Sequence, residues 1–295
     1  MSTMMTTRRT FLNQIALIAG GTMLSGTVGR AFAGDKSDDE IFRDTMAWAK
    51  TQGLAKLPVG EAMAAFGKHF IGTPYVAHSL EEPGDEHLVV NLRGFDCLTF
   101  VENMLAMARC VRSGKATFDD FKKQLTLIRY TGGVISGYPS RLHYFTDWMK
   151  DNGAKGVLHP LTQELGGVAY TKTIDFMSTH TASYRQLADT AFVQRIRAAE
   201  TALNASPLYY IPAEMISGIE GKLQSGDVIG AVTTMAGIDI AHTGMVLHTG
   251  GKAHFLHAPL SGKHVLVSDG SLAQYIQSIR SHTGIVVGRP LEPVR

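Results

Sequence analysis

A cysteine and two histidines are the residues of this 295-residue sequence best suited to catalysis. Cys97 follows Asp96, a residue type that caps helix N-termini, so Cys97 is predicted to be the first residue of its helix. The unpaired N–H groups and the positive dipole of a helix start favour a thiolate, the nucleophilic form of cysteine. Such a nucleophile needs a base that takes up the proton and protonates the leaving amine. A small buried cysteine is the other interpretation of this position.

Two strand histidines are the predicted partners of that thiol. Gly250-Gly251 separates two alternating runs, which predicts a two-residue hairpin turn. In that register His257 lies diagonally across from His242 on the same face, about 7–8 Å away. His254 falls on the opposite face, and His248 lies about 20 Å down the strand. One extra turn residue would reverse these faces.

Helical patterns come first in the sequence and strand patterns later. Helices are predicted at 41–52, 59–70, 97–111, 118–128, 140–149, 183–204 and 271–279. Strands are predicted at 227–233, 243–248, 253–257, 264–267 and 284–287. The order predicts an α+β fold with a helical N-terminal part packed on a mostly antiparallel sheet.

Residues 1–33 are predicted to be an export signal. Arg8 and Arg9 precede a weakly apolar run at 15–28, and Ala31-Phe32-Ala33 places small residues where a signal peptidase cuts. The paired arginines favour the twin-arginine route, with an ordinary secretory signal as the alternative. We therefore expect a periplasmic or secreted protein. Residues 34–295 would form a single catalytic domain with an N-terminal helical extension and insertions.

Composition excludes several classes of function. Hydrophobic residues make up 44% of the chain and charged residues 18%, as in soluble globular proteins. The predicted signal holds three of the 28 basic residues, which leaves 25 basic against 26 acidic residues in the mature chain. No basic patch points to nucleic acid, and no apolar run reaches the roughly 18 residues of a stable membrane span. We expect a monomer.

The two cysteines are predicted to be free thiols. Cys97 and Cys110 lie on one predicted helix, about 20 Å apart along its axis. A disulfide needs Cα atoms within about 7 Å. A free thiol in an exported protein favours a chemical role for Cys97, whereas Cys110 lies beside the apolar stripe and is expected to be structural. Glu102 would face either the pocket or solvent.

Several stretches resemble a family of cell-wall hydrolases, the NlpC-type papain-like cysteine peptidases. The order of Asp96-Cys97, His242 and His257 is that of this group. The closest resemblance is to its N-acetylmuramoyl-L-alanine amidase-like branch. The stretches that carry it are Ile71–Tyr75, Phe95–Glu102, Ser140-Arg141-Leu142-His143-Tyr144-Phe145-Thr146-Asp147-Trp148, Tyr210-Ile211-Pro212, Gly226–Ile229, Ile240–Gly244 and Gly288-Arg289-Pro290.

The resemblance implies a reaction and roles for three residues. Cys97 would be the nucleophile, His242 the general base and acid, and His257 the residue that orients His242. Peptidoglycan fragments (muropeptides) would be the substrate, and the amide between N-acetylmuramic acid and L-Ala the scissile bond. Most NlpC-type enzymes cut within the stem peptide, so an endopeptidase of the same fold is the alternative. The resemblance implies no cofactor.

Four further residues are candidates for substrate binding. Tyr75 could donate to the oxyanion or could be a packed turn aromatic. Arg141 suits muropeptide carboxylates, and the aromatic rings of His143 and Tyr144 suit sugars. All but Tyr75 are expected on one short helix with Trp148, which is expected in the core.

A zinc amidase and a non-catalytic wall-binding module are the rival interpretations. The chain has 12 histidines, but His242 and His257 lack the His-x-x-x-His or His-Glu-x-x-His spacing of zinc sites. We therefore predict no metal. The intact set of Cys97, His242 and His257 favours an enzyme over a binding module. Activity that is sensitive to chelators and resistant to iodoacetamide would contradict the cysteine mechanism.

Overall fold

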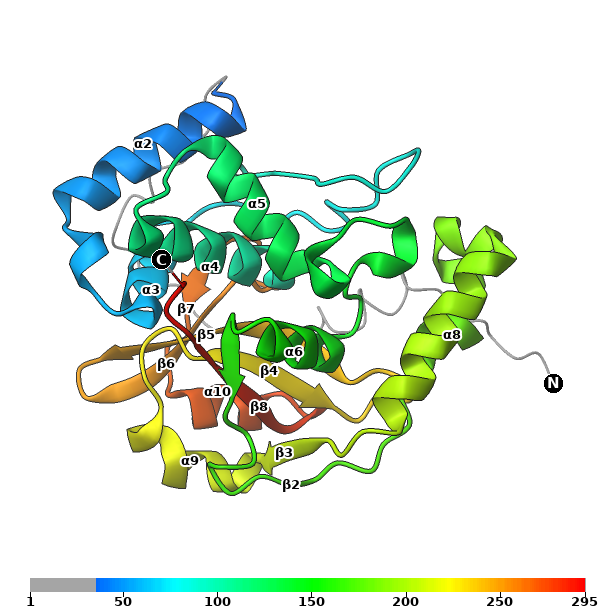
Figure 1. The fold of residues 1–295 in the computed structure, drawn as a ribbon. Coiled ribbons are helices and arrows are strands. Elements are labelled where there is room, and N and C mark those ends of the chain that lie inside the picture. Colours follow the sequence, from blue (N-terminus) through cyan, green and yellow to red (C-terminus); the bar gives the residue numbers. More distant parts are fainter. Residues whose placement is uncertain (1–35, 295) are drawn as a thin grey trace.

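An antiparallel sheet organises the chain, with helices on both of its faces (Figure 1). The structure, a computed structural model, describes residues 36–294, so the predicted signal at 1–33 lies outside the described residues. The sheet has eight strands in the order β2-β3-β8-β4-β5-β6-β7, and β1 also pairs with β8. Because β8 lies between β3 and β4, the last strand of the chain is central to the sheet. The α+β prediction is confirmed.

The elements have the following bounds. The helices are α2 (Asp38–Thr51), α3 (Val59–His69), α4 (Cys97–Ser113), α5 (Phe118–Arg129), α6 (Phe145–Ala154), α7 (Phe176–Thr179), α8 (Thr190–Asn204), α9 (Ile216–Ile219) and α10 (Leu272–Ser278). The strands are β1 (Leu158–Pro160), β2 (Val168–Ala169), β3 (Tyr209–Pro212), β4 (Val228–Thr233), β5 (Ile240–Thr249), β6 (Lys252–His257), β7 (Leu266–Val267) and β8 (His282–Pro290).

Alternate residues of the central strands fill two cores. On β4, Val228 and Val232 belong to the core that the sheet shares with α2 to α6, whereas Ile229 and Ala231 belong to the core under α9 and α10. This is the two-residue period of a strand that is covered on both faces. Every residue of β4 is accordingly buried. A third cluster, which includes Tyr144, lies under α7 and α8.

Most predicted elements are confirmed within a few residues. Capping boxes start four helices, at Ser37, Asp96, Thr117 and Ser271, and the cap at Asp96 was predicted. The strands β1, β2 and β3 were not predicted. The predicted helix 183–204 begins only at Thr190, after short 3-10 turns.

The predicted helix 140–149 is wrong in its first half. A 3-10 turn at Tyr138–Ser140 is followed by four non-helical residues, and α6 begins at Phe145. Asp239 fixes that start, because its Oδ2 accepts hydrogen bonds from the backbone N–H and the hydroxyl of Thr146 at 2.7 and 2.9 Å. Arg141, His143 and Tyr144 therefore lie on an extended segment that enters α6 and not on a shared helix.

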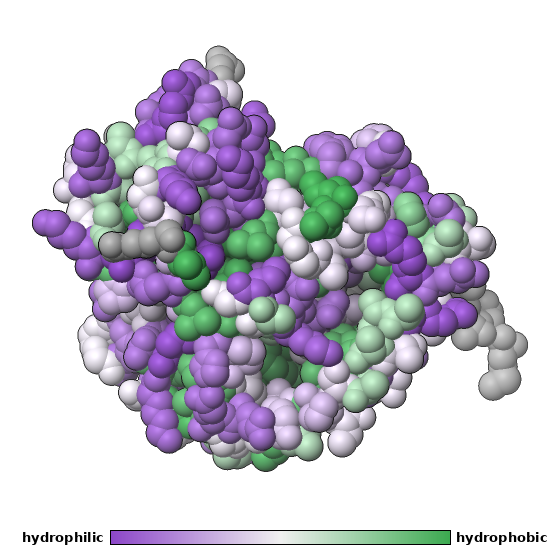
Figure 2. Space-filling view, viewed as in Figure 1, coloured by the Kyte–Doolittle hydropathy of each residue, from purple (hydrophilic) through white to green (hydrophobic). Residues whose placement is uncertain are grey.

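Among residues 36–294, no helix combines the length and apolar character needed to cross a bilayer. Figure 2 shows hydrophilic residues over most of one face, with apolar groups scattered between them. The large hydrophobic side chains that are exposed belong to separate elements, as Val134, Met215 and Leu291 illustrate.

Candidate active site

Cys97 is the first residue of α4, at the end of a largely buried helix. Asp96 is the N-cap: its Oδ1 accepts a hydrogen bond from the backbone N–H of Thr99 at 2.8 Å, and the Thr99 hydroxyl accepts one from the Asp96 N–H at 2.9 Å. The next twelve residues from Thr99 to Cys110 are all buried, so the helix is held on all sides. The cap and the packing together fix the position of Cys97.

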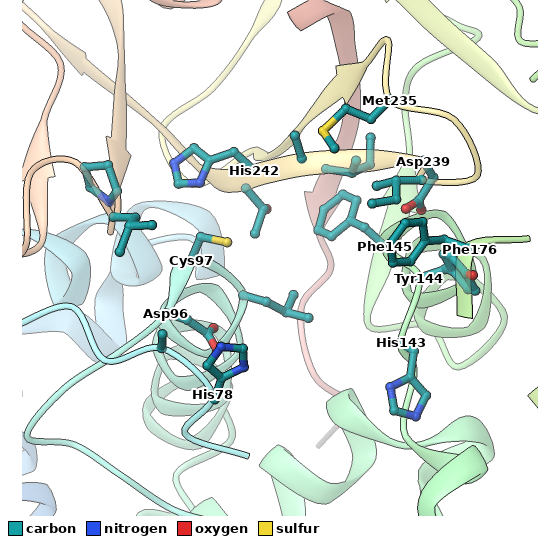
Figure 3. Close-up of a pocket in the computed structure, with 18 of the residues that line it drawn as sticks. His78, Asp96, Cys97, His143, Tyr144, Phe145, Phe176, Met235, Asp239 and His242 are labelled. Carbon is teal, nitrogen blue, oxygen red and sulfur yellow. The ribbon is translucent and has the colours of Figure 1, made fainter. Parts of the chain in front are cut away.

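A cavity of about 850 Å³ opens in front of Cys97. Figure 3 shows the sulfur directed into it, with the His242 ring beside it and the segment from His143 to Phe145 across the space. Cys97 and His242 both line this cavity. Both cysteines are free thiols, as predicted, and Cys110 is buried.

The Cys97 sulfur experiences opposing influences. The backbone N–H groups of Cys97, Leu98 and Thr243 point at it and lower its pKa. Burial, and secondly the Asp96 carboxylate, raise the pKa more, to about 12. The predicted thiolate of the free protein is therefore wrong, because the loss of hydration outweighs the helix start. Cys97 rests as a thiol that must lose its proton during attack.

The β5–β6 hairpin has the predicted register. Gly250 and Gly251 both adopt left-handed φ values, +58° and +77°, as a two-residue type I′ turn requires. Gly244 then pairs with His257. His242 and His257 share a face, and Nε2 of His242 lies 2.7 Å from Nδ1 of His257. This bond leaves Nδ1 of His242 as the ring nitrogen that can accept a proton from Cys97.

Gly244 makes room for this pair of rings. A Cβ added at Gly244 would lie 2.7 Å from the Cβ of His257 and 2.7 Å from the backbone oxygen of Leu256. It would also approach the Phe255 ring, which stacks on His257 at a centroid distance of 4.6 Å. A side chain at this position would displace the histidine, which explains the glycine in His242-Thr243-Gly244.

Burial keeps both imidazoles neutral. It lowers the pKa of His242 to about 3, with a smaller contribution from His282. The pKa of His257 also lies well below its ordinary value. Burial is the main cause, and the charge that His242 carries when protonated is the second. The resting site is thus a thiol beside a neutral, hydrogen-bonded pair of imidazoles. That state is competent for general-base catalysis.

The other two hairpin histidines have structural partners away from this pair. His254, on the opposite face, bonds through Nδ1 to the Ser268 carbonyl oxygen at 3.0 Å. His248 bonds through Nε2 to the Leu223 carbonyl oxygen at 2.8 Å. The register argument selected two of the four nearby histidines, and the structure brings those two together.

Sequence reasoning missed two residues of the site, Tyr275 and His282. Tyr275, on α10, packs edge-on against His257 with ring centroids 4.7 Å apart. His282, the first residue of β8, lines the cavity, and burial lowers its pKa to about 4. Its position beside the site depends on β8 pairing with β4, which lies next to β5. Strand order of this kind leaves no local signal in a sequence.

The four candidate substrate-binding residues all line the cavity. Tyr75 lies in a short bridge to Phe95 at the cavity wall. The carbonyl oxygen of Tyr138 bonds to Nε2 of His143 at 2.9 Å. The Tyr144 hydroxyl donates to Glu200 at 2.7 Å. Roles for Tyr75, Arg141, His143 and Tyr144 in binding substrate remain predictions.

Arg141 is held by the loop that forms one wall of the cavity. Its guanidinium donates to the Leu80 carbonyl oxygen at 2.7 Å and to Glu81 at 3.0 Å, and lies over the Tyr138 ring at 4.9 Å. Oε1 of Glu86 also lies 3.6 Å from Nε of Arg141. These contacts show that Arg141 positions the loop.

Glu102 lies at the cavity wall and not toward solvent, and its carboxylate is buried in an ion pair. Its Oε2 accepts a hydrogen bond from Nε of Arg129 at 2.7 Å, with both side chains almost fully enclosed. Arg129 also donates to the Val89 carbonyl oxygen at 2.6 Å. Trp148 is in the core, as predicted. Among residues 36–294, no group of three or more His, Cys, Asp or Glu side chains is arranged to hold a metal.

Comparison with known proteins now adds a family to this geometry. The profile of the AmiA-like family, described as N-acetylmuramoyl-L-alanine amidase-like, matches residues 65–285. The chain belongs to this family. An amidase-like peptidoglycan hydrolase family supports an enzymatic role for the chain. None of the curated proteins is a match.

Solved structures agree with this membership. An N-acetylmuramoyl-L-alanine amidase from Bacteroides uniformis is 32% identical, with a TM-score of 0.74 over 79% of this chain and 99% of that one. A putative xylanase from Bacteroides fragilis is 34% identical, with a TM-score of 0.71 over 76% of this chain and 99% of that one. A Legionella pneumophila protein, 20% identical, shares the fold with a TM-score of 0.62 over 87% and 97% of the two chains.

Proposed function

We propose that this protein is an exported cysteine amidase that hydrolyses the bond between N-acetylmuramic acid and L-Ala in muropeptides. The observation that carries the proposal is the 2.7 Å bond between His242 and His257, at a cavity into which Cys97 points. Membership in an amidase-like family supports the substrate class. The order of Cys97, His242 and His257 supports an NlpC-type, papain-like mechanism without a cofactor.

The geometry supports a sequence of proton transfers that balances. Nδ1 of His242 takes the proton of the Cys97 thiol as the sulfur attacks the lactyl carbonyl carbon. The Cys97 backbone N–H, at the start of α4, is placed to donate to the oxyanion, and Tyr75 is the second candidate donor. His242 then gives its proton to the departing L-Ala nitrogen. His242 next deprotonates a water that attacks the thioester, and it returns this proton to the Cys97 sulfur as the muramyl acid is released.

The carboxylates of the cavity do not favour glycosidase chemistry. A glycosidase needs two carboxyl groups available to the sugar, one as acid and one as nucleophile or base. Four acidic residues line the cavity in the described part of the chain, and each has a structural partner: Glu81 with Arg141, Asp96 with Thr99, Glu102 with Arg129 and Asp239 with Thr146. The amide is therefore the bond that this cavity is better suited to cut.

The N-terminal sequence supports export of the protein as part of the same proposal. Arg8-Arg9 and Ala31-Phe32-Ala33 support export by the twin-arginine route and cleavage after residue 33. The mature protein would act in the periplasm or outside the cell, as a monomeric single catalytic domain.

Matched cysteine variants test the proposal. Cys97→Ser should abolish release of an L-Ala-stem peptide from a defined muropeptide, as read by mass spectrometry. Cys110→Ser should retain it, because Cys110 is buried away from the cavity. Chelators should leave the wild-type rate unchanged. Turnover by Cys97→Ser, or loss of activity with a chelator, would contradict the cysteine mechanism, and products cut within the stem would indicate an endopeptidase.

A further inference from the structure

A second cavity, of about 570 Å³, lies beside His257. Its wall includes His257 and the polar residues Ser261, His264, Ser268 and Asp269. The cavity in front of Cys97 does not reach His257, but three residues line both spaces and so form the partition between them: Pro259, Ser261 and Tyr275. His257 therefore borders a polar space that is separate from the cavity in front of Cys97.

His257 lines this second cavity and has one ring nitrogen without a protein partner in the described residues. Its Nδ1 is bound to His242, and its Nε2 finds no hydrogen-bond partner within residues 36–294. The residue is only 1% exposed, so bulk solvent does not reach the ring directly. Buried polar nitrogens are rarely left without a partner, and polar cavities of this size hold ordered water.

The proposed chemistry fixes which proton Nε2 carries. His242 must accept the thiol proton at Nδ1, so its own N–H is at Nε2 and donates to Nδ1 of His257. An imidazole whose Nδ1 accepts carries its proton on Nε2. Nε2 of His257 is therefore a donor, and it requires an acceptor that no residue among 36–294 supplies.

We propose that the second cavity is a solvent site where water accepts a hydrogen bond from Nε2 of His257 and links it to the Asp269 carboxylate. Asp269 would then stabilise the imidazolium that forms on His242 when Cys97 attacks, acting through water and His257. No proton moves to Asp269: His242 gains the thiol proton and passes it to the leaving amine. This inference rests on the proposed function.

Among the described residues that line the second cavity, Asp269 is the one with a carboxylate. It is exposed at the cavity wall, so its charge is partly screened and its influence is modest. His264, when protonated, would oppose it. The titratable groups that contact the His257 ring, influence its charge or line the second cavity with it are His242, His264, Asp269, Tyr275 and His282.

Two charge-matched variants test the electrostatic role. Asp269→Asn should lower kcat/KM about threefold to fivefold at low salt, the range expected of a partly screened charge. It should also move the acid limb of the pH profile to lower pH, because removing a negative charge makes the imidazoles harder to protonate. Asp119→Asn, an equal charge change on an exposed residue of α5 that lines neither cavity, should do neither. If the two variants behave alike in both respects, Asp269 has no such role.

A crystal structure at high resolution tests the solvent site without relying on activity. The expected result is a water within about 3.2 Å of Nε2 of His257 that is also bonded, directly or through a second water, to Asp269. A dry cavity, or Nε2 bonded to a protein group, would overturn the inference. An enzyme that is inactive on muropeptides but holds this water would contradict the proposed function while leaving the solvent site in place.

Discussion

The resting protonation state of Cys97 gives a quantitative prediction for its reaction with iodoacetamide. Only the thiolate reacts, so the rate follows the fraction of sulfur that is ionised. The pKa of about 12 lies three units above the ordinary cysteine value of 9.0. At pH 8 the thiolate fraction is thus about one part in 10⁴ instead of about one in ten, a deficit of about 1000-fold. The rate should rise about tenfold per pH unit between pH 7 and 10.

The assay uses Cys110→Ser protein, so that Cys97 is the one thiol left in the chain. Intact mass, followed over time at a series of pH values, gives the alkylation rate. Glutathione alkylated under the same conditions supplies the reference for an unburied thiol.

Rapid alkylation whose rate is constant between pH 5 and 8 would show a thiolate paired with a protonated His242, and the neutral resting state would be wrong. A slow rate without a pH slope would instead mean that the reagent cannot enter the cavity.

Three other substitutions test the packing around the site. Gly244→Ala should lower kcat/KM about 100-fold, because its Cβ would lie 2.7 Å from the Cβ of His257 and displace that ring, and misplacement by an ångström has effects of that size. His282→Gln should make stability less sensitive to acid: burial lowers the His282 pKa from 6.5 to about 4, so its stabilising contribution is complete above pH 6.5 and is lost as the pH falls toward 4. Between pH 7.5 and pH 5 the wild type should lose about 2 kcal/mol of unfolding free energy through His282, and the variant should not. Urea unfolding at the two pH values measures this difference. Glu102→Leu should lower the free energy of unfolding by about 3–5 kcal/mol, because it leaves the Arg129 charge buried and unpaired.

Each of these substitutions has a control. Gly218→Ala adds a Cβ with no atom within 4 Å and should leave kcat/KM unchanged. If Gly244→Ala is as active as Gly218→Ala, the steric explanation for Gly244 is wrong. His159→Gln, at an exposed position, should keep the acid sensitivity of the wild type, and the same result for His282→Gln would contradict the burial effect. Adding Arg129→Met to Glu102→Leu should restore much of the stability, and failure to do so would show that the charge is not the cause.

The local geometry of the site could be predicted because it depends on short-range rules. Asp96 and Thr99 define a capping box within four residues, which places Cys97 at the start of its helix. Gly250-Gly251 fixes the hairpin register, and the register alone puts His242 and His257 on one face. Both signals lie close together in the chain, so no tertiary knowledge was needed.

The failures share a cause in long-range packing. The segment from Arg141 to Tyr144 has helical spacing, but its side chains are bound by Leu80, Glu81 and Glu200, far away in the sequence. The helix start favours a thiolate at Cys97, but burial, which no spacing reveals, reverses the balance. His282 reaches the site only through the position of β8 in the sheet.

The acyl-enzyme provides the most direct test of the central claim. Wild-type protein mixed with a defined muropeptide and quenched in acid should carry a thioester on Cys97, detectable by mass spectrometry of the peptide that contains this residue. Attack on the amide before L-Ala predicts that the added mass is that of the muramyl acyl group. An adduct derived from the stem peptide would contradict the assigned bond. Turnover with no adduct on Cys97, together with activity in Cys97→Ser, would contradict the nucleophile itself.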